Sequence, residues 1–191
     1  MHFAIILLLS LVFLSGCSTN NDVADIRITL PDEIIDAPVD GRLLIMIADN
    51  NTREPRFQIS DGAATQLIFG MDADGWEPGG TLRFDSDAIG YPLRSIKEIP
   101  EGDYYIQAFL NRYETFNLST GHTIKMHMDQ GEGQQWLRSP GNLYSEAVKI
   151  SVTKRGKISA TLELVNTIPP IAPAEDSEYI KHIRIESKSL T

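Results

Sequence analysis

The chain of 191 residues contains a single cysteine, Cys17, and no apolar run long enough to span a membrane. A lone cysteine excludes a disulfide within one molecule. The longest apolar stretch, residues 3–14, has about twelve residues, whereas a membrane-spanning helix needs roughly twenty. A run of this length near the amino terminus is typical of a secretory signal peptide. Lys and Arg, which usually precede such a run, are also missing, and only His2 stands there.

The residues that follow the apolar run, Leu14-Ser15-Gly16-Cys17, resemble the lipobox of bacterial lipoproteins. The resemblance implies that residues 1–16 are a signal peptide, that Cys17 is acylated, and that residues 17–24 tether the domain to the lipid. Ser18 after the cysteine implies sorting to the outer membrane. We therefore expect a lipid-anchored protein of the bacterial cell envelope that contacts the membrane through Cys17. The alternative is an ordinary thiol at Cys17 in an uncleaved apolar tail.

Basic residues are outnumbered by acidic ones. The chain has 17 Lys and Arg against 26 Asp and Glu, which gives a net charge of −9 and a pI near 4.9. A chain with this overall charge is a poor candidate for binding nucleic acid or anionic lipid surfaces. We therefore expect no nucleic-acid partner.

A strand with alternating side chains, within residues 99–118, is the clearest structural signal. Pro100 and Gly102 form a turn, after which apolar and aromatic residues alternate between two faces. Tyr104, an aromatic at the head of this strand, resembles the tyrosine corner of immunoglobulin-like sandwiches. Residues 42–48 are apolar at nearly every position and predict a central strand covered on both faces.

The chain as a whole predicts an all-β fold. We expect an immunoglobulin-like antiparallel β-sandwich of about 7–9 strands, preceded by an N-terminal signal helix. The sandwich is expected over residues 25–167, followed by a Pro-rich linker over 168–177 and an orphan C-terminal strand over 178–191. Residues 72–80 are expected to form a loop because of their Asp, Gly and Pro content.

No catalytic constellation is found in the sequence. There is no Gly-x-Ser-x-Gly elbow, and Ser119 near His122 lacks an orienting acid. His122 and His127 fall on opposite faces of a strand, so they cannot share a metal ion. Asp72 and Asp74 resemble the start of a calcium loop, but the ligand pattern then fails, and a solvated acidic turn is the simpler interpretation. We expect no catalytic residue, no cofactor, and only this weak calcium candidate.

One long segment without periodicity, residues 129–146, is the best candidate for a ligand or partner loop. Loops of this length inside a compact domain are often functional. Its amide, guanidinium and aromatic groups are those that bind sugars or peptides and anchor protein interfaces. The alternative is that Trp136 and Tyr144 tuck into the sandwich and hold the loop down. The candidate residues are Gln134, Gln135, Trp136, Arg138, Asn142 and Tyr144.

Several short strings together resemble a known group of proteins. They include residues 41–47, 54–57, 69–72, 90–93 and 100–108, and above all Gly133-Gln134-Gln135-Trp136 followed by Ser139-Pro140-Gly141-Asn142-Leu143-Tyr144-Ser145. Over about residues 41–187 the chain is similar to the N-terminal, non-catalytic region of secreted bacterial esterases, in which an enterochelin-esterase-like α/β-hydrolase domain follows. The sequence contains no such hydrolase domain, so the resemblance implies an architecture and no reaction.

These observations lead to three expectations about function. The first is a non-catalytic, lipid-anchored envelope lipoprotein whose β-sandwich binds a protein or a carbohydrate or serves as an accessory module. The second is a truncated or split N-terminal domain of an esterase that docks to a catalytic domain on another chain. The third is a calcium-stabilised, adhesion-like domain.

Overall fold

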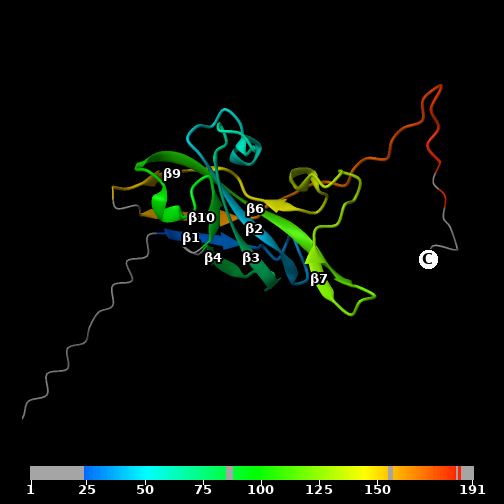
Figure 1. The fold of residues 1–191 in the computed structure, drawn as a ribbon, viewed down its shortest axis with the longest axis horizontal. Helices are drawn as coiled ribbons and strands as arrows, with labels where there is room; N and C mark the ends of the chain where they lie inside the picture. Colours follow the sequence, from blue (N-terminus) through cyan, green and yellow to red (C-terminus); the bar gives the residue numbers. More distant parts are fainter. Residues whose placement is uncertain (1–23, 85–87, 155–156, 184, 186–191) are drawn as a thin grey trace, which may run out of the picture.

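The computed structural model describes residues 24–84, 88–154, 157–183 and 185, and these form two packed β-sheets (Figure 1). They contain eleven strands and three short 3₁₀ helices, and none of them forms a helix with the length and hydropathy needed to span a bilayer. The expected all-β sandwich is therefore confirmed. The expected signal helix, Cys17 and all of the tether except Ala24 lie outside the described residues.

Most strands are short, and the longest lie at the centre of the larger sheet. In chain order the elements are β1 (Ala24–Thr29), β2 (Val39–Ala48), η1 (Pro55–Gln58), β3 (Leu67–Trp76), β4 (Thr81–Phe84), β5 (Ile89–Tyr91), η2 (Ile96–Glu98), β6 (Gly102–Asn117), β7 (Thr123–Met126), η3 (Trp136–Arg138), β8 (Leu143–Tyr144), β9 (Val148–Val152), β10 (Ile158–Glu163) and β11 (Asn166–Thr167).

The larger sheet has eight strands and is built around β2 and β6. Its order is β11-β8-β6-β2-β3-β5, and β7 and β9 also pair with β6. Both faces of β2 are covered, as its continuous apolar run predicts. Leu43 and Ile45 belong to the main core, while Met46 packs in a second cluster with Phe109 of β6. Side chains of a strand alternate between faces, so these two clusters lie on opposite faces of the sheet.

The smaller sheet, in the order β10-β1-β4, packs against the main-core face of the larger one. Ile26 and Ile28 of β1 and Leu162 of β10 are buried in this core. β1 runs antiparallel to β4 but parallel to β10, which departs from the expected all-antiparallel arrangement. Nearly the whole domain separates β1 from β10 in sequence and supplies the long connection that a parallel pair requires. The strand number exceeds the expected one because β5, β8 and β11 have only two or three residues each.

The start of β6 has the geometry of a tyrosine corner. The Tyr104 hydroxyl donates a hydrogen bond to the carbonyl oxygen of Pro100 at 3.0 Å. The ring thereby fixes the strand to the turn that precedes it, as in immunoglobulin-like domains. The structure thus agrees with what the position of Tyr104 in the sequence indicates.

Two segments that the sequence predicts as loops contain regular structure. β3 continues through residues 72–76, because pairing with β2 across an irregularity between Val39 and Gly41 overrides the turn-forming composition of that stretch. The segment 129–146 contains η3 and β8. The predicted loop boundaries are therefore wrong at both places.

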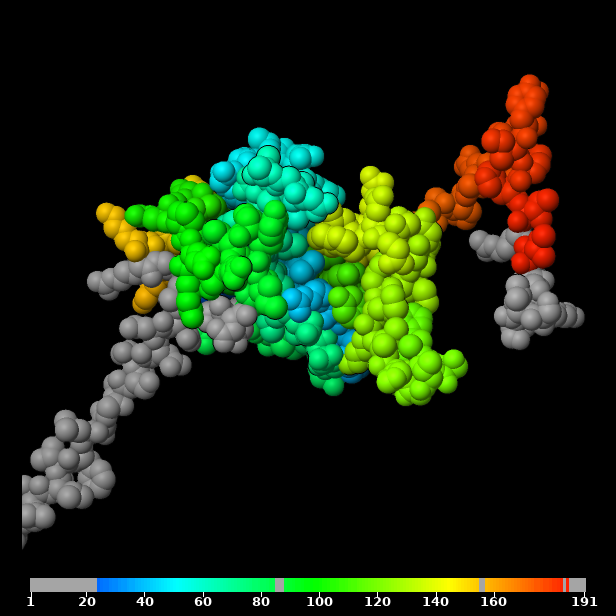
Figure 2. Space-filling model, in the orientation of Figure 1, coloured from blue at the N-terminus to red at the C-terminus, as the bar shows by residue number. Residues whose placement is uncertain are grey.

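The chain after residue 168 extends away from the domain as an arm (Figures 1 and 2). The described residues 178–183 and 185 form no strand, so the expected orphan strand is not formed in this part of the chain. A strand requires a neighbour for its backbone hydrogen bonds, and the arm lies beside none of the described sheet edges. The arm exposes the large apolar side chains of Tyr179, Ile180, Ile183 and Ile185.

Candidate binding site beside strand β6

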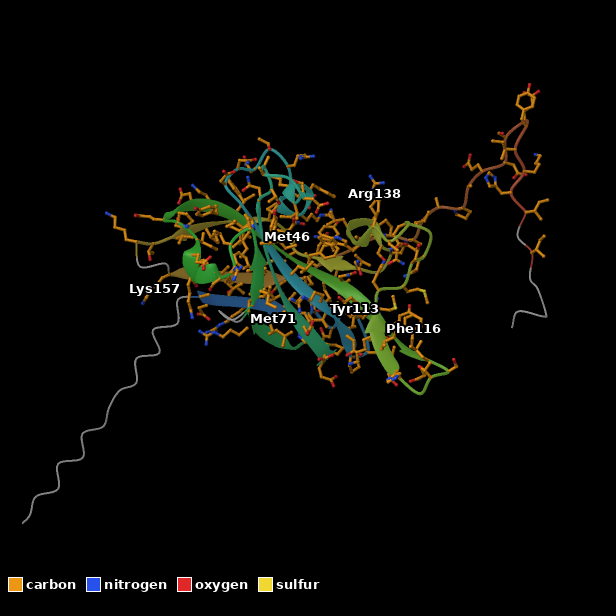
Figure 3. All side chains as sticks on the ribbon, viewed as in Figure 1. Met46, Met71, Tyr113, Phe116, Arg138 and Lys157 are labelled. Carbon is orange, nitrogen blue, oxygen red and sulfur yellow. The ribbon has the colours of Figure 1, made fainter. Side chains whose placement is uncertain are left out.

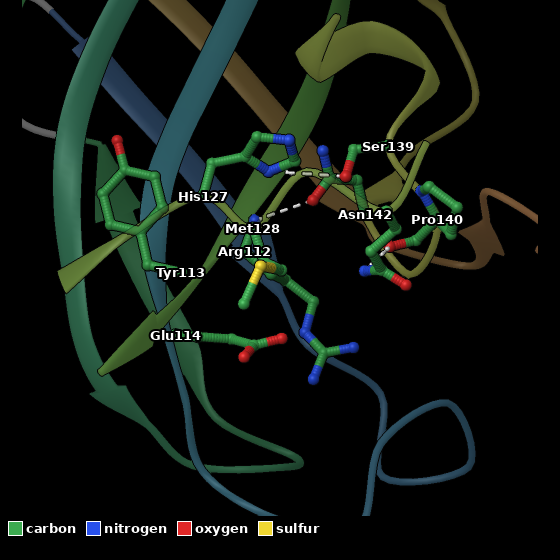
Figure 4. Close-up of a pocket in the computed structure, with 9 residues that line it drawn as sticks. Arg112, Tyr113, Glu114, His127, Met128, Ser139, Pro140 and Asn142 are labelled. Atoms are coloured by element: carbon green, nitrogen blue, oxygen red, sulfur yellow. Dashed lines mark hydrogen bonds between the residues drawn. The ribbon is translucent and has the colours of Figure 1, made fainter. Parts of the chain in front are cut away.

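One edge of β6 carries three short strands in succession, and the candidate site lies between two of them. β9 pairs with residues 102–106 of β6, β8 with 109–110 and β7 with 114–117. In the gap between β8 and β7, residues of the segment 127–142 approach the edge, and a cavity of about 80 Å³ lies there (Figure 4). It is lined by Arg112, Tyr113, Glu114, His127, Met128, Gln130, Ser139, Pro140 and Asn142.

His127 joins two distant parts of the segment that covers the gap. Its Nε2 lies 2.6 Å from Oε1 of Glu132. Its Nδ1 lies 3.3 Å from Oγ of Ser139 (Figure 4). The Glu132 side chain is only 1% exposed and also accepts a bond from the backbone N–H of Gln130 at 2.8 Å. Burial raises the pKa of Glu132, but the bonds from Gln130 and His127 outweigh it and hold this pKa below its ordinary value. We call His127, Glu132 and Ser139 the histidine clasp.

A hydroxyl, an imidazole and a carboxylate in contact are also the groups of a nucleophilic triad. Acyl transfer further needs N–H donors that are available to the developing oxyanion. Around the clasp, the backbone N–H groups of Ser139, Gly141 and Asn142 each donate to a backbone carbonyl, and Pro140 has no N–H. Ser139 itself is buried. The geometry therefore favours a structural role for the clasp over a reaction centre.

No pattern in the sequence indicates the clasp. The hydroxyl–imidazole pair considered there, Ser119 and His122, lies in the exposed turn between β6 and β7. His127 meets Glu132 and Ser139 only because the segment after β7 folds back on itself. Spacing along the chain does not encode such contacts.

Half of the predicted loop residues hold the segment to the sheet. The Trp136 ring packs edge-on against Phe109, with ring centroids 5.3 Å apart at an interplanar angle of 82°. The Asn142 side chain is buried, accepts a bond from the backbone N–H of Arg112 at 2.8 Å, and donates to the carbonyl oxygen of Trp136 at 2.8 Å. The Tyr144 ring is half-buried against a guanidinium group. These contacts match the alternative in which the aromatic residues hold the loop down.

The other three predicted residues, Gln134, Gln135 and Arg138, are exposed. Gln134 has a φ of 64°, in the left-handed region that non-glycine residues rarely adopt. Arg138 points out from η3, on the side away from Phe116 (Figure 3). These side chains are placed to meet a partner, but they do not line the cavity.

A buried polar cluster lies on the same face of the sheet as Trp136. The Arg56 guanidinium carbon lies 4.3 Å from the ring centre of Phe57 and 3.8 Å from that of Tyr144. Its Nε donates to Glu54 at 2.8 Å, and Gln107 of β6 donates to the same carboxylate oxygen at 2.8 Å. Burial raises the pKa of Glu54, but these two bonds outweigh it, so the pKa lies below its ordinary value. Nothing in the sequence marks Arg56 as a buried residue, because arginine is usually exposed.

Asp72 and Asp74 lie in β3, and each faces a cation of the protein. Asp72 accepts a bond from Arg42 at 2.7 Å, and Asp74 accepts one from Lys125 at 3.0 Å. Lys125 also lies 2.9 Å from Asp40. Within the described part of the chain, no three His, Cys, Asp or Glu side chains are grouped to hold a metal ion. The two residues of the weak calcium candidate thus lie in a strand and not in a loop, and each is paired with a cation of the protein.

The second half of β6 and the strand β7 form a hairpin that projects from the domain beside the cavity (Figures 1 and 2). Phe116 lies opposite Ile124 in the pairing, and Glu114 lies opposite Met126, so these four side chains share one face. Ile124 and Met126 are exposed, as is Leu118 in the turn. Clustered exposed apolar side chains mark contact sites for other molecules.

No protein-family model, curated protein or solved structure matches the chain. A function for it therefore has to be proposed from the motif at Cys17 and from the geometry described above.

Proposed function

We propose that the chain is a non-catalytic, lipid-anchored lipoprotein of the bacterial cell envelope, sorted to the outer membrane, whose β-sandwich binds a partner. One observation carries this proposal. The lipobox-like residues Leu14-Ser15-Gly16-Cys17 end only seven positions before Ala24, which is buried and begins β1. A cysteine acylated at this place holds a folded domain next to a membrane by a short tether.

The proposed anchor and the β6–β7 hairpin lie at opposite ends of the domain. The start of β1 lies beside β10, with Ala24 next to Ile158, and the hairpin of β6 and β7 lies at the opposite end (Figure 1). β6 has 16 residues, which at about 3.3 Å per residue span roughly 50 Å. An anchor before Ala24 therefore leaves the hairpin facing away from the membrane.

A protein partner is favoured over a carbohydrate by the side chains at this far end. Sugars bind to exposed aromatic faces. The Trp136 ring packs on Phe109 and the Tyr144 ring packs on Arg56, so neither is presented to a sugar. The hairpin instead exposes Ile124 and Met126, and apolar side chains within a polar rim are typical of protein interfaces.

Metabolic labelling with an alkyne analogue of palmitate tests the anchor. In a bacterial host, we expect the full chain to incorporate the label and the Cys17→Ser variant to lack it at equal expression. Label on both variants would show that a residue other than Cys17 is modified. Label on neither would overturn the lipoprotein proposal.

Site-specific photocrosslinking in the same host tests the partner surface. A photoreactive residue at Ile124 is expected to give a discrete crosslinked band. The matched control is Thr161, an exposed residue of β10 away from the hairpin. Equal crosslinking from both positions, or none from Ile124, would contradict a partner at the hairpin.

A second candidate function is docking to a catalytic hydrolase domain on another chain. The specific observation in its favour is the arm, which exposes Tyr179, Ile180, Ile183 and Ile185 without burying them on its own domain. We expect a serine hydrolase, detected with a fluorophosphonate probe, to co-purify with the full chain and not with a chain that ends at residue 177. Failure to co-purify with either would contradict this candidate.

A further inference from the structure

A broad groove lies at the end of the domain where β1 begins. It measures about 740 Å³ and includes Ser151, Thr153, Lys154 and Lys157 in its lining, with Glu101 and Asp103 on the β6 side. Two bonds join the end of β9 to the start of β10: the N–H of Thr153 donates to the Lys157 carbonyl at 3.2 Å, and the N–H of Lys157 donates to Thr153 Oγ1 at 3.1 Å. Thr153 and Lys157 are therefore held next to each other at this end of the domain.

The segment 147–162, which supplies both lysines of the groove, is opposite in charge to the chain as a whole. Between Glu146 and Glu163 the sequence has four cations and no carboxylate, although the net charge of the chain is −9. Of the two carboxylates in the groove, Asp103 is already paired with Lys149 at 2.8 Å and with the Ser151 hydroxyl at 2.6 Å. Lys154 and Lys157 are exposed and form no ion pair with any described residue.

The groove is also the part of the domain that an anchor brings to the bilayer. Ala24 lies opposite Ile158 in the parallel pair of β1 and β10, and Ile158 directly follows Lys157. Lys157 accordingly lies at the end of the domain far from Phe116 (Figure 3). Seven residue steps from Cys17 to Ala24 reach at most about 25 Å. A lipid on Cys17 therefore keeps both lysines close to the headgroups.

We propose that this groove docks on anionic phospholipid headgroups, with Lys154 and Lys157 binding phosphate and with the Thr153 hydroxyl donating a hydrogen bond. The inference rests on the lipid anchor of the proposed function. Lysines next to an anionic bilayer attract it, while the acidic remainder of the domain is repelled. Docking through this end sets the orientation of the domain and turns the β6–β7 hairpin outward.

The test uses the chain from Cys17 onward, whose only thiol allows coupling to maleimide lipid in vesicles. The vesicles consist of phosphatidylcholine alone or mixed with phosphatidylglycerol, and the acetylation rate of each lysine is followed by mass spectrometry. We expect Lys154 and Lys157 to react roughly fivefold more slowly on the anionic vesicles, as headgroup contact at a charged surface implies. The rate at Lys181, on the arm, should not change, and high salt should abolish the difference.

Paired variants provide the matched control. With Cys17 capped, K154Q/K157Q is expected to bind anionic vesicles about thirtyfold more weakly than the parent chain. R138Q/K181Q removes the same charge at the other end and should bind like the parent. Equal acetylation rates on both kinds of vesicle, or equal weakening in both double variants, would overturn the proposal.

Inorganic phosphate distinguishes the two possible ligands of the lysines, the phosphate of a lipid headgroup and free phosphate. Added to phosphatidylcholine vesicles, it is expected to leave both lysines reactive, and protection equal to that on anionic vesicles would overturn headgroup docking in favour of a free-phosphate site. Chemical coupling bypasses cellular acylation. Failure of palmitate labelling and failure of this test are therefore distinguishable.

Discussion

The two halves of β6 show one strand in two different environments. From Gly102 to Leu110 it lies between β2 on one side and β9 and β8 on the other, and its residues from Ile106 to Leu110 are all buried. From Asn111 to Asn117 none of its residues is buried: β2 pairs with it only as far as Tyr113, and β7 pairs with residues 114–117. The first half is stabilised by apolar packing. The second half is held by pairing and by surface charges, which leaves its side chains available for contact.

The largest difference in stability is expected between alanine variants of two phenylalanines in this strand. Phe109 is fully buried against Met46 and Trp136, whereas Phe116 is half-exposed on the hairpin. Phe109→Ala should lower the free energy of unfolding by about 4 kcal/mol, through lost burial and the cavity left behind. Phe116→Ala should lower it by less than about 1 kcal/mol. Urea unfolding measures both, and equal losses would remove the distinction between the halves.

Loss of an ion pair should also cost more stability beside the buried half of β6 than at the hairpin. Arg56→Met leaves Glu54, the partner of Gln107, without its cation and is expected to cost about 2 kcal/mol. This is less than for a fully buried pair, because solvent reaches the Glu54 carboxylate. Lys125→Met, at the hairpin, should change the melting temperature much less. A larger loss of stability from Lys125→Met than from Arg56→Met would show that charge, and not strand pairing, holds the hairpin.

Removal of one hydrogen bond tests the start of the buried half. Tyr104→Phe keeps the ring but deletes the bond to Pro100 and should cost about 1 kcal/mol. The measurement is again urea unfolding, with Tyr113→Phe as the control because no hydrogen bond of its hydroxyl is found in the described part of the chain. Equal stability of Tyr104→Phe and the parent would mean that the corner is held by packing alone.

Acid should loosen the clasp beside the exposed half. The pKa of Glu132 is lowered in the folded chain, so its contribution to stability is complete above the ordinary value of 4.5 and is lost as the pH falls through the folded pKa. Glu132→Gln removes this titration. Its melting temperature is therefore expected to fall less than that of the parent as the pH is lowered below 4.5. Parallel curves for the two chains would contradict an ionised clasp.

The sequence predicted those parts of the fold that depend on local pattern. The apolar run of β2 indicated a strand covered on both faces, and the place of Tyr104 after a turn indicated its corner. In contrast, β3 runs through Asp72 and Asp74 because β2 lies beside it, and local composition cannot show that. The parallel pairing of β1 with β10 likewise depends on how the whole chain closes.

The candidate site was only partly predictable for the same reason. The segment 129–146 was recognised from its lack of periodicity, and its aromatic residues do lie in it. Their roles depend on Phe109 and Arg56, which are distant in sequence. The clasp of His127, Glu132 and Ser139 also forms only after the segment folds back. Residue types were visible in the sequence, whereas the contacts between them were not.

The position of β1 has a mechanical consequence. This strand is hydrogen-bonded on both sides, to β10 along all six of its residues and to β4 along four. A pull on the chain before Ala24 acts along the strand axis, so these bonds must slide together and cannot open one after another. The domain is therefore built to resist tension from the direction in which a tether would load it.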